Sequence, residues 1–288
     1  MEEKVTSLGC FLRRVQECRS HWRIREHKEI WFRGVGKKHD ATLLRPELYR
    51  PRANKSLRQI SDLLDIENEL YEELQRCADQ FRNEALDREY WDWDSYFLLQ
   101  HHGGATRLLD WSDGALMAVH FAIRDPSGND DEDAYIYVLD PDGLNERLKA
   151  MHGESGLEAR WCAYVKDSQS KGTTDIKEDE WEDAFLPSDK EDRAKFEIPM
   201  APLVLNFPHI TRRVAAQRSR FIVLGTDYEF LANEFRREDS AMKQIVIDGA
   251  FRRQLRRELR DSGITESVIY PDLDGVGREM KQLWQARK

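Results

Sequence analysis

The 288-residue sequence has few features that could cross-link or anchor it. Its four cysteines are scattered, with no Cys-x-x-Cys pair, so neither a disulfide framework nor a thiolate zinc site is expected. No apolar run approaches the roughly 20 residues of a membrane-spanning helix. The opening residues Met1–Lys4 lack the basic and then apolar pattern of a secretory signal. We therefore expect a soluble, cytoplasmic protein without a membrane partner.

An excess of positive charge is also missing, because the formal net charge is -9. General binding to nucleic acid is therefore not expected, since it requires Lys and Arg to neutralise phosphates. Residues 251–260 nevertheless carry five arginines at helical spacing. We interpret them as a solvated helix face with Phe251, Leu255 and Leu259 turned inward; binding to phosphate or to an acidic segment is the alternative.

Apolar residues make up 40% of the chain, enough for a large core, and their spacing predicts the fold class. Helical periodicity occurs early, at 5–20 and 56–85, and an aromatic-rich helix is expected near 91–99. Apolar strand-like runs occur at 30–34, 134–139, 221–225 and 242–247. We predict one α+β domain over residues 1–288, with helices around a small mixed or antiparallel sheet and a helical N-terminal half.

Residues 152–198 interrupt this pattern. Between 175 and 192 there are nine acidic residues and two lysines, a density that disfavours a core. We expect an acidic insertion, partly mobile, that is either solvated surface, a lid over the site or a contact for a basic protein partner. Trp161 and Phe185 indicate that it docks somewhere.

The segment Gln100–Trp111 combines two adjacent histidines, a Gly pair, an arginine and an aspartate. Glycine permits backbone conformations that other residues avoid, and histidine titrates near neutral pH. An apolar helical run begins at Ala115, so the polar residues border a core element. This segment is our first candidate for a functional site, although Arg107 and Asp110 could instead form a buried ion pair that fixes the loop.

Together with other motifs, this segment resembles the FRG-domain family. The matching motifs are Phe32-Arg33-Gly34, Leu43-Leu44-Arg45-Pro46, Gln100-His101-His102-Gly103, Thr106-Arg107-Leu108-Leu109-Asp110-Trp111, Arg213 with Ala216-Gln217, and Tyr270-Pro271-Asp272-Leu273-Asp274-Gly275. Two departures from the family pattern are Ala105, where proline is frequent, and Arg218-Ser219, which replaces a small or glycine-containing step.

The resemblance suggests a distant ADP-ribosyltransferase-like fold with NAD as substrate and no metal. Proteins of that class carry Arg or His on an early core strand, then a hydroxyl or aromatic motif, then a late Glu or Gln. Arg33 would bind a pyrophosphate or ribose oxygen, and Gly34 would let the ligand approach the backbone. The expected catalytic residues are His101, His102 and Gln217. The expected ligand-binding residues are Arg33, Gly34, Gln100, Gly103, Thr106, Arg107, Asp110 and Arg213.

Other functions remain open at this point. The same arginines suit a non-catalytic module that senses a nucleotide or a phosphorylated ligand. A metal-dependent phosphodiesterase or nuclease is a third reading, with candidate ligands His101, His102, Asp110, Asp113, Asp272 and Asp274. The resemblance also hints at bacterial defence or toxin systems.

Overall fold

The computed structural model describes residues 3–36, 44–51, 56–78, 91–124, 132–172, 177–205 and 212–285. Helices surround a six-stranded sheet whose strand pairs are all antiparallel, so the predicted α+β class is confirmed. The strands are β1 (Trp31–Val35), β2 (Leu108–Ser112), β3 (Ala134–Leu139), β4 (Leu203–Leu205), β5 (Ser219–Val223) and β6 (Met242–Ile247). None of the helices in these ranges is long and apolar enough to cross a membrane.

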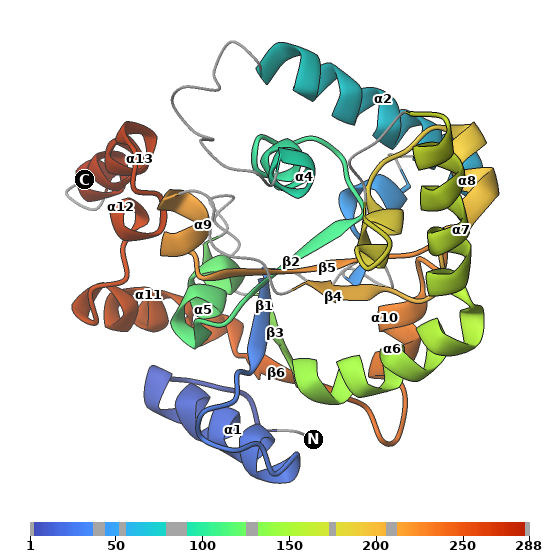
Figure 1. Cartoon of the computed structure of the whole chain (residues 1–288). Coiled ribbons are helices and arrows are strands. Elements are labelled where there is room, and N and C mark those ends of the chain that lie inside the picture. Colours follow the sequence, from blue (N-terminus) through green and yellow to red (C-terminus); the bar gives the residue numbers. More distant parts are fainter. Residues whose placement is uncertain are drawn as a thin grey trace.

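The sheet has the order β4-β5-β2-β1-β3-β6 and divides in the middle. The central strands β1 and β2 pair through one residue pair, Phe32 and Ser112, whereas β1 pairs with β3 over five residues and β2 with β5 over five. In Figure 1 the strands β2, β4 and β5 lie along one line across the view, and the strands β1, β3 and β6 lie along a clearly different one. The two halves therefore diverge at the β1–β2 junction.

Three helices cover one face of the β1-β3-β6 half, namely α1 (Leu8–His21), α5 (Ala115–Ile123) and α11 (Arg252–Asp261). Leu255 and Leu259 of α11 are buried there, as the helical spacing predicted. Arg252 of the same helix is also buried, and its guanidinium donates to the carbonyl oxygens of Gly36, Ala122 and Glu132. One of the five arginines thus supports the core instead of a solvated face.

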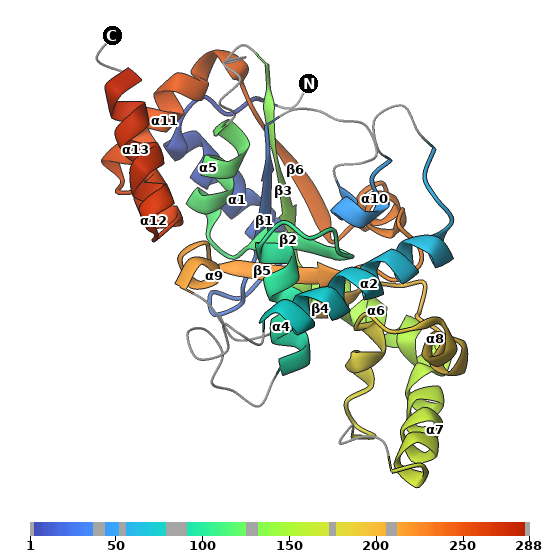
Figure 2. The ribbon, with the colours of Figure 1, turned by 90° about the horizontal axis from the view of Figure 1, so that it is seen from above.

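A second layer packs on the β4-β5-β2 half. It contains α2 (Ile60–Ala78), α4 (Trp91–His101), α7 (Leu157–Ser170), η4 (Trp181–Phe185) and α8 (Lys190–Phe196). Figure 2 shows α7 and α8 extending this layer away from the sheet. Trp161, Phe185 and Phe196 are buried in it, so residues 152–198 pack on the chain, as Trp161 and Phe185 indicated, and contribute to the core despite their acidic composition. Acidic residues of this segment come from the same helices whose apolar side chains are buried. Asp175 lies outside the described residues.

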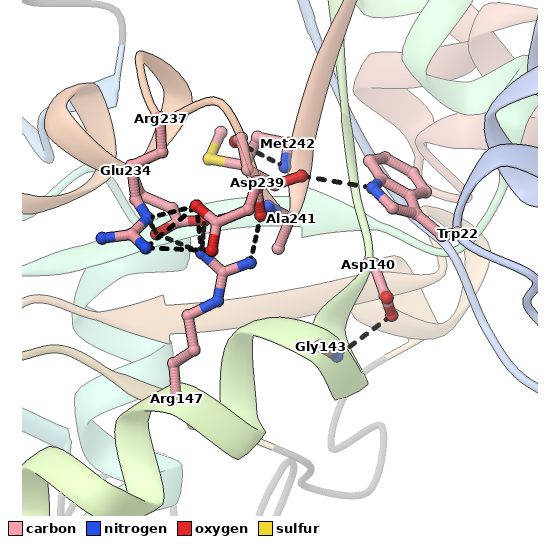
Figure 3. A network of polar contacts seen from close by, with 10 residues as sticks. Trp22, Asp140, Gly143, Arg147, Glu234, Arg237, Asp239, Ala241 and Met242 are labelled. Atoms are coloured by element: carbon pink, nitrogen blue, oxygen red, sulfur yellow. Dashed lines mark hydrogen bonds and ion pairs between the residues drawn. The ribbon is translucent and has the colours of Figure 1, made fainter.

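The third part of the core lies on the other face of the sheet from the two layers above. It is covered by η2 (Glu47–Tyr49), α6 (Pro141–Ser155) and α10 (Phe230–Phe235). A buried carboxylate, Glu234, fixes the entry into β6. It accepts from Arg147 Nη1 at 2.8 Å and from the Ala241 N–H at 2.9 Å, and Arg237 lies 3.5 Å away (Figure 3). This network satisfies the carboxylate from three sides, which indicates a structural role.

The last part of the chain forms a separate group of short helices beside α5. It consists of α9 (Arg212–Ala216), η5 (Gly249–Phe251), α12 (Glu266–Ile269) and α13 (Leu273–Gln285) together with α11. Figure 1 shows α9, α12 and α13 lying together on one side of the sheet. Tyr270, between α12 and α13, is buried against Ile269 and Met117.

Candidate functional site

The divergence of β1 and β2 leaves a gap in the backbone ladder that Arg33 occupies. Beyond the Phe32–Ser112 pair, the Asp110 carbonyl oxygen receives its hydrogen bond from Arg33 Nη1, at 2.5 Å. A side chain thus replaces the backbone donor that a continuous sheet would provide. The half-buried guanidinium of Arg33 is therefore placed at the junction of the two sheet halves.

A short chain of polar groups holds the Asp110 carboxylate at the same junction. Gln100 Nε2, at the end of α4, donates to Asp110 Oδ2 at 2.9 Å. Thr106 Oγ1 donates to Gln100 Oε1 at 2.5 Å, so the amide of Gln100 has one orientation only. Asp110 itself is exposed. Gln100 and Thr106 therefore position an acceptor that solvent or a ligand can reach.

The Gly pair after the histidines shapes the turn that makes this arrangement. Gly103 has φ +87°, a conformation that favours glycine, and its N–H donates to the Gln100 carbonyl. A Cβ on Gly104 would lie 2.3 Å from a Leu99 side-chain carbon. Both glycines serve the end of α4, and Gly103 contacts the site only through the backbone of Gln100.

Arg33 also belongs to a row of side chains that crosses the other sheet half. In the strand register Arg33 lies opposite Tyr137, and Tyr137 lies opposite Gln244. Burial lowers the pKa of Arg33 to about 10; the charge of Asp110 opposes this shift, and that of Arg50 adds to it. The guanidinium stays protonated at neutral pH. It thus presents a cation between a carboxylate on one side and a phenol and an amide on the other.

Gly34 has a different role from the one expected. A Cβ at this position would lie 1.9 Å from the carbonyl oxygen of Ala118 and 2.8 Å from the Ala122 nitrogen, both in α5. The expectation that Gly34 opens space for a ligand is wrong, because α5 fills that space. Glycine is required here for the close packing of β1 on α5.

Arg107 lies in the core and away from Arg33. Its side chain is 0% exposed, and its Nε donates to Glu67 Oε2 at 2.5 Å. Glu67 also accepts from the Arg107 N–H at 2.7 Å and from the hydroxyl of Tyr96. The ion pair weighed in the sequence does form, but with Glu67 and not with Asp110. A ligand at the junction would not reach this guanidinium.

The charges of Arg213 and Asp272 act on His101, at the end of α4. Burial, together with the charges of Arg213 and His102, lowers the pKa of His101 to about 4, although Asp272 raises it. The His101 ring is half-buried, while His102 is exposed and lies edge-on to it, with 5.1 Å between ring centroids. Of the three arginines expected to bind a ligand, Arg107 is thus in a buried ion pair, Arg33 lies beside Asp110, and Arg213 lies near His101.

Gln217 lies at the entry to β5, next to β2. Its Nε2 faces the Ile269 carbonyl oxygen at 3.4 Å, and its own carbonyl accepts from Ser112 Oγ at 2.7 Å. Arg218, where the family pattern has a glycine-containing step, adopts φ +51°. The contacts of Gln217 join α12 to the strand pair, so its side chain is engaged in the fold.

Comparison with protein families supplies the decisive observation: residues 28–131 match the FRG domain. The chain carries an FRG domain. The match includes Arg33, Gln100, Asp110 and the strands β1 and β2, and it ends before Arg213, Gln217 and the segment 270–275. Neither the curated proteins nor the solved structures contain a match to the chain.

Two of the aspartates considered as metal ligands, Asp113 and Asp272, have other partners. Asp113 pairs with Arg218 and, at 2.6 Å, with Arg220 Nη2. Asp272 Oδ1 accepts from the Gly275 N–H at 2.7 Å and so begins α13. Within the ranges that the structure describes, His, Cys, Asp and Glu side chains do not gather in threes as a metal site requires.

The sequence motifs include Arg33 but not the two residues that lie in one row with it across β3 and β6. Tyr137 and Gln244 enter the site only through the pairing of β1, β3 and β6, which no local pattern reveals. A weak signal was present, because Tyr135 and Tyr137 alternate with apolar residues in a strand that otherwise reads as buried. Arg50 is brought near Arg33 by the end of η2.

Proposed function

We propose that this FRG domain uses NAD, cleaving its nicotinamide in the manner of an ADP-ribosyltransferase or NAD hydrolase, at the β1–β2 junction. The observation that carries the proposal is that the three motif-bearing strands are neighbours. Arg33 is on β1, Asp110 and Ser112 are on β2, and Gln217 precedes β5, in the sheet order β5-β2-β1. An early Arg strand, a second motif with a hydroxyl and a late Gln are the features that the resemblance implied for this class.

The chemistry of the junction suits a dinucleotide. The planar guanidinium of Arg33 can donate two parallel hydrogen bonds to a pyrophosphate or ribose oxygen. Arg50 adds positive charge nearby. Gln244, which is half-buried, supplies an amide for the base or the carboxamide, and the buried Tyr137 supports it from β3. A ligand with phosphates, sugars and an amide would use Arg33, Arg50 and Gln244.

The Asp110 carboxylate suits the reaction itself. In this reaction the C1′–N bond of the nicotinamide riboside breaks, and the bonding electrons leave with nicotinamide. A C1′–O bond then forms to water or to an acceptor hydroxyl, which gives up its proton. Positive charge develops on the sugar meanwhile, and a positioned carboxylate stabilises it electrostatically. Asp110 replaces the neutral Gln217 in this role.

A second candidate is a non-catalytic module that senses a nucleotide or phosphorylated ligand. It is favoured by the engagement of Gln217 with Ile269 and Ser112, which leaves the third motif without a free side chain. In this reading the acidic residues between 177 and 192 contact a basic protein partner. Their contact with a partner and a role in bacterial defence stay predictions.

The experiment that separates the two candidates is incubation of the purified chain with NAD, with and without cell lysate. Mass spectrometry would follow free nicotinamide and ADP-ribosylated products. The enzyme proposal expects nicotinamide release that falls at least 100-fold in Arg33→Gln and in Asp110→Asn, while Arg257→Gln, an exposed arginine on α11, keeps full activity. Binding of NAD without release under both conditions would favour the sensing module. Neither binding nor release would contradict the enzyme proposal and would leave a sensing module for another nucleotide or phosphorylated ligand.

A further inference from the structure

Three guanidinium groups surround the ring of Tyr270. The Cζ atoms of Arg124 and Arg213 each lie 4.6 Å from the ring centroid, and that of Arg278 lies 4.4 Å from it. They come from α5, α9 and α13, so the chain brings three positive charges to one residue from distant segments. Each gains from the electrons of the ring, but together they repel one another.

One buried carboxylate contacts two of these guanidinium groups. Glu266 Oε1 lies 3.2 Å from Arg124 Nε, and Glu266 Oε2 lies 3.2 Å from Arg278 Nε. His120 is also near, at 3.3 Å. The single negative charge of Glu266 is therefore shared by Arg124 and Arg278, so the group of three arginines keeps a net positive charge.

Arg213 is the third arginine of this group. Among the described residues it makes no ion pair, and its buried Nε has no hydrogen-bond partner. Buried donors almost always have a partner, so an orphaned guanidinium nitrogen points to an acceptor supplied from outside the chain. The Nε atom itself is buried, but the residue as a whole is half-buried, so an anion can reach other parts of the side chain.

His101, at the end of α4, lies close enough to Arg213 for the charge of that arginine to act on its ring. The charged and titratable groups that act on it are Arg213, His102 and Asp272, from α9, the end of α4 and the turn before α13. It is neutral at pH 7, so one ring nitrogen can donate to an anion while its charge adds no repulsion. Asp272 opposes an anion, but its Oδ1 is occupied by the Gly275 N–H.

We propose that Arg213 and His101 bind a phosphate group at a site distinct from the Arg33 junction. Arg213 supplies the charge and the fork of donors, Tyr270 holds its guanidinium flat, and His101 donates from the other side. Gln100 and His101 are consecutive at the end of α4; Gln100 donates to Asp110, and His101 is under the influence of Arg213, so α4 contributes one residue to each site. The phosphate can be free or part of a phosphate ester.

The test is a calorimetric titration of the full chain with inorganic phosphate at pH 7 and constant ionic strength. The expected result is saturable binding that weakens at least tenfold in Arg213→Gln and is unchanged in Arg257→Gln. Arg33→Gln should also leave it unchanged, so failure of the NAD proposal does not affect this one. Equal affinity in Arg213→Gln, or no saturable binding to the wild type, would overturn the proposal.

A second measurement needs no variant at Arg213. The ring signals of His101, assigned by NMR through their loss in His101→Gln, should shift on addition of phosphate but not of chloride. The pKa of His101 should rise from about 4 as phosphate binds, since the anion favours the charged ring. Adenosine 5′-monophosphate identifies the source: a shift with it assigns a phosphate ester, and a shift with inorganic phosphate alone assigns the free anion. An unmoved His101 signal with both would contradict the site.

Discussion

Arg33 and Arg107 come from two motifs of the same domain, and the structure gives them opposite surroundings. Arg107 is wholly buried, and its donors go to Glu67 and to the carbonyl oxygens of Phe185 and Leu224. Arg33 is half-buried in the middle of β1, at the β1–β2 junction, and it donates to the backbone of Asp110, whose side chain is exposed. The first guanidinium is enclosed by the fold, and the second is held where a ligand can meet it.

The difference shows that the motifs of one domain can contain both arginines enclosed in the core and arginines that a ligand can reach. Burying a guanidinium costs several kcal/mol unless a carboxylate and hydrogen bonds offset it, and Arg107 has both. Its bonds link α2, η4 and the strand β2. Removing either arginine separates the two roles, because one change should affect folding and the other binding.

The largest expected effect is on the buried pair. Arg107→Met should destabilise the chain by about 3–5 kcal/mol, because Glu67 would keep a buried charge without a partner. Urea unfolding of the wild type and the variant measures this difference. The double variant Arg107→Met with Glu67→Leu should recover much of the loss, and a loss below about 1 kcal/mol in the single variant would mean that the pair contributes little.

The carboxylate of Glu266, which contacts Arg124 and Arg278, should make the stability of the chain depend on pH. Burial alone would raise its pKa, but His120, Arg124 and Arg278 lower it to about 2, from an ordinary value of 4.5. Stabilisation on the order of 3 kcal/mol is therefore present above pH 4.5 and is lost as the pH falls towards 2. Unfolding free energies at several pH values should show this loss in the wild type and a shallower one in Glu266→Gln; parallel curves would contradict it.

The glycines of the two motifs provide a smaller contrast. Gly34→Ala should cost about 1–3 kcal/mol, because its Cβ would meet backbone atoms of α5. Gly103→Ala should cost about 1–2 kcal/mol through its positive φ alone, since open space surrounds that position. Thermal unfolding can rank the two, and Gly103→Asn should recover part of the second loss. An unchanged melting temperature in Gly34→Ala would contradict the packing role.

The smallest expected effect on stability is at Arg33 itself. Arg33→Gln removes the hydrogen bond to the Asp110 carbonyl at a half-buried position, and no buried carboxylate is left without a partner as in Arg107→Met, so the loss should be about 1 kcal/mol. The same urea unfolding measures it. A loss comparable to that of Arg107→Met would make Arg33 a structural residue and remove the difference between the two motifs.

The sequence predicted the α+β class and the strands near β1, β3, β5 and β6, because each is a compact apolar run. It missed β2, in which four buried residues flank the exposed Asp110, and β4, which has three residues. For residues 152–198 it indicated docking through Trp161 and Phe185 but not how deeply these residues and Phe196 would be buried. Local charge density did not reveal which apolar residues would meet in the core.

The candidate site was predicted in part. Arg33, Gln100, Thr106 and Asp110 do come together, because a strand, a helix end and a tight turn are neighbours in the motif segments. The partner of Arg107 could not be predicted, since Glu67 lies 40 residues away on a helix without a motif. Tyr137 and Gln244 likewise depend on strand register, which is decided by the whole sheet.

The most direct test of the account is equilibrium binding of NAD to the wild type, Arg33→Gln and Arg257→Gln, with the unfolding free energy of each measured in parallel. We predict that Arg33→Gln loses at least tenfold in affinity while its unfolding free energy stays within about 1 kcal/mol of the wild type, and that Arg257→Gln matches the wild type in both. NAD binding of equal strength in Arg33→Gln would contradict the assignment of the β1–β2 junction as the ligand site.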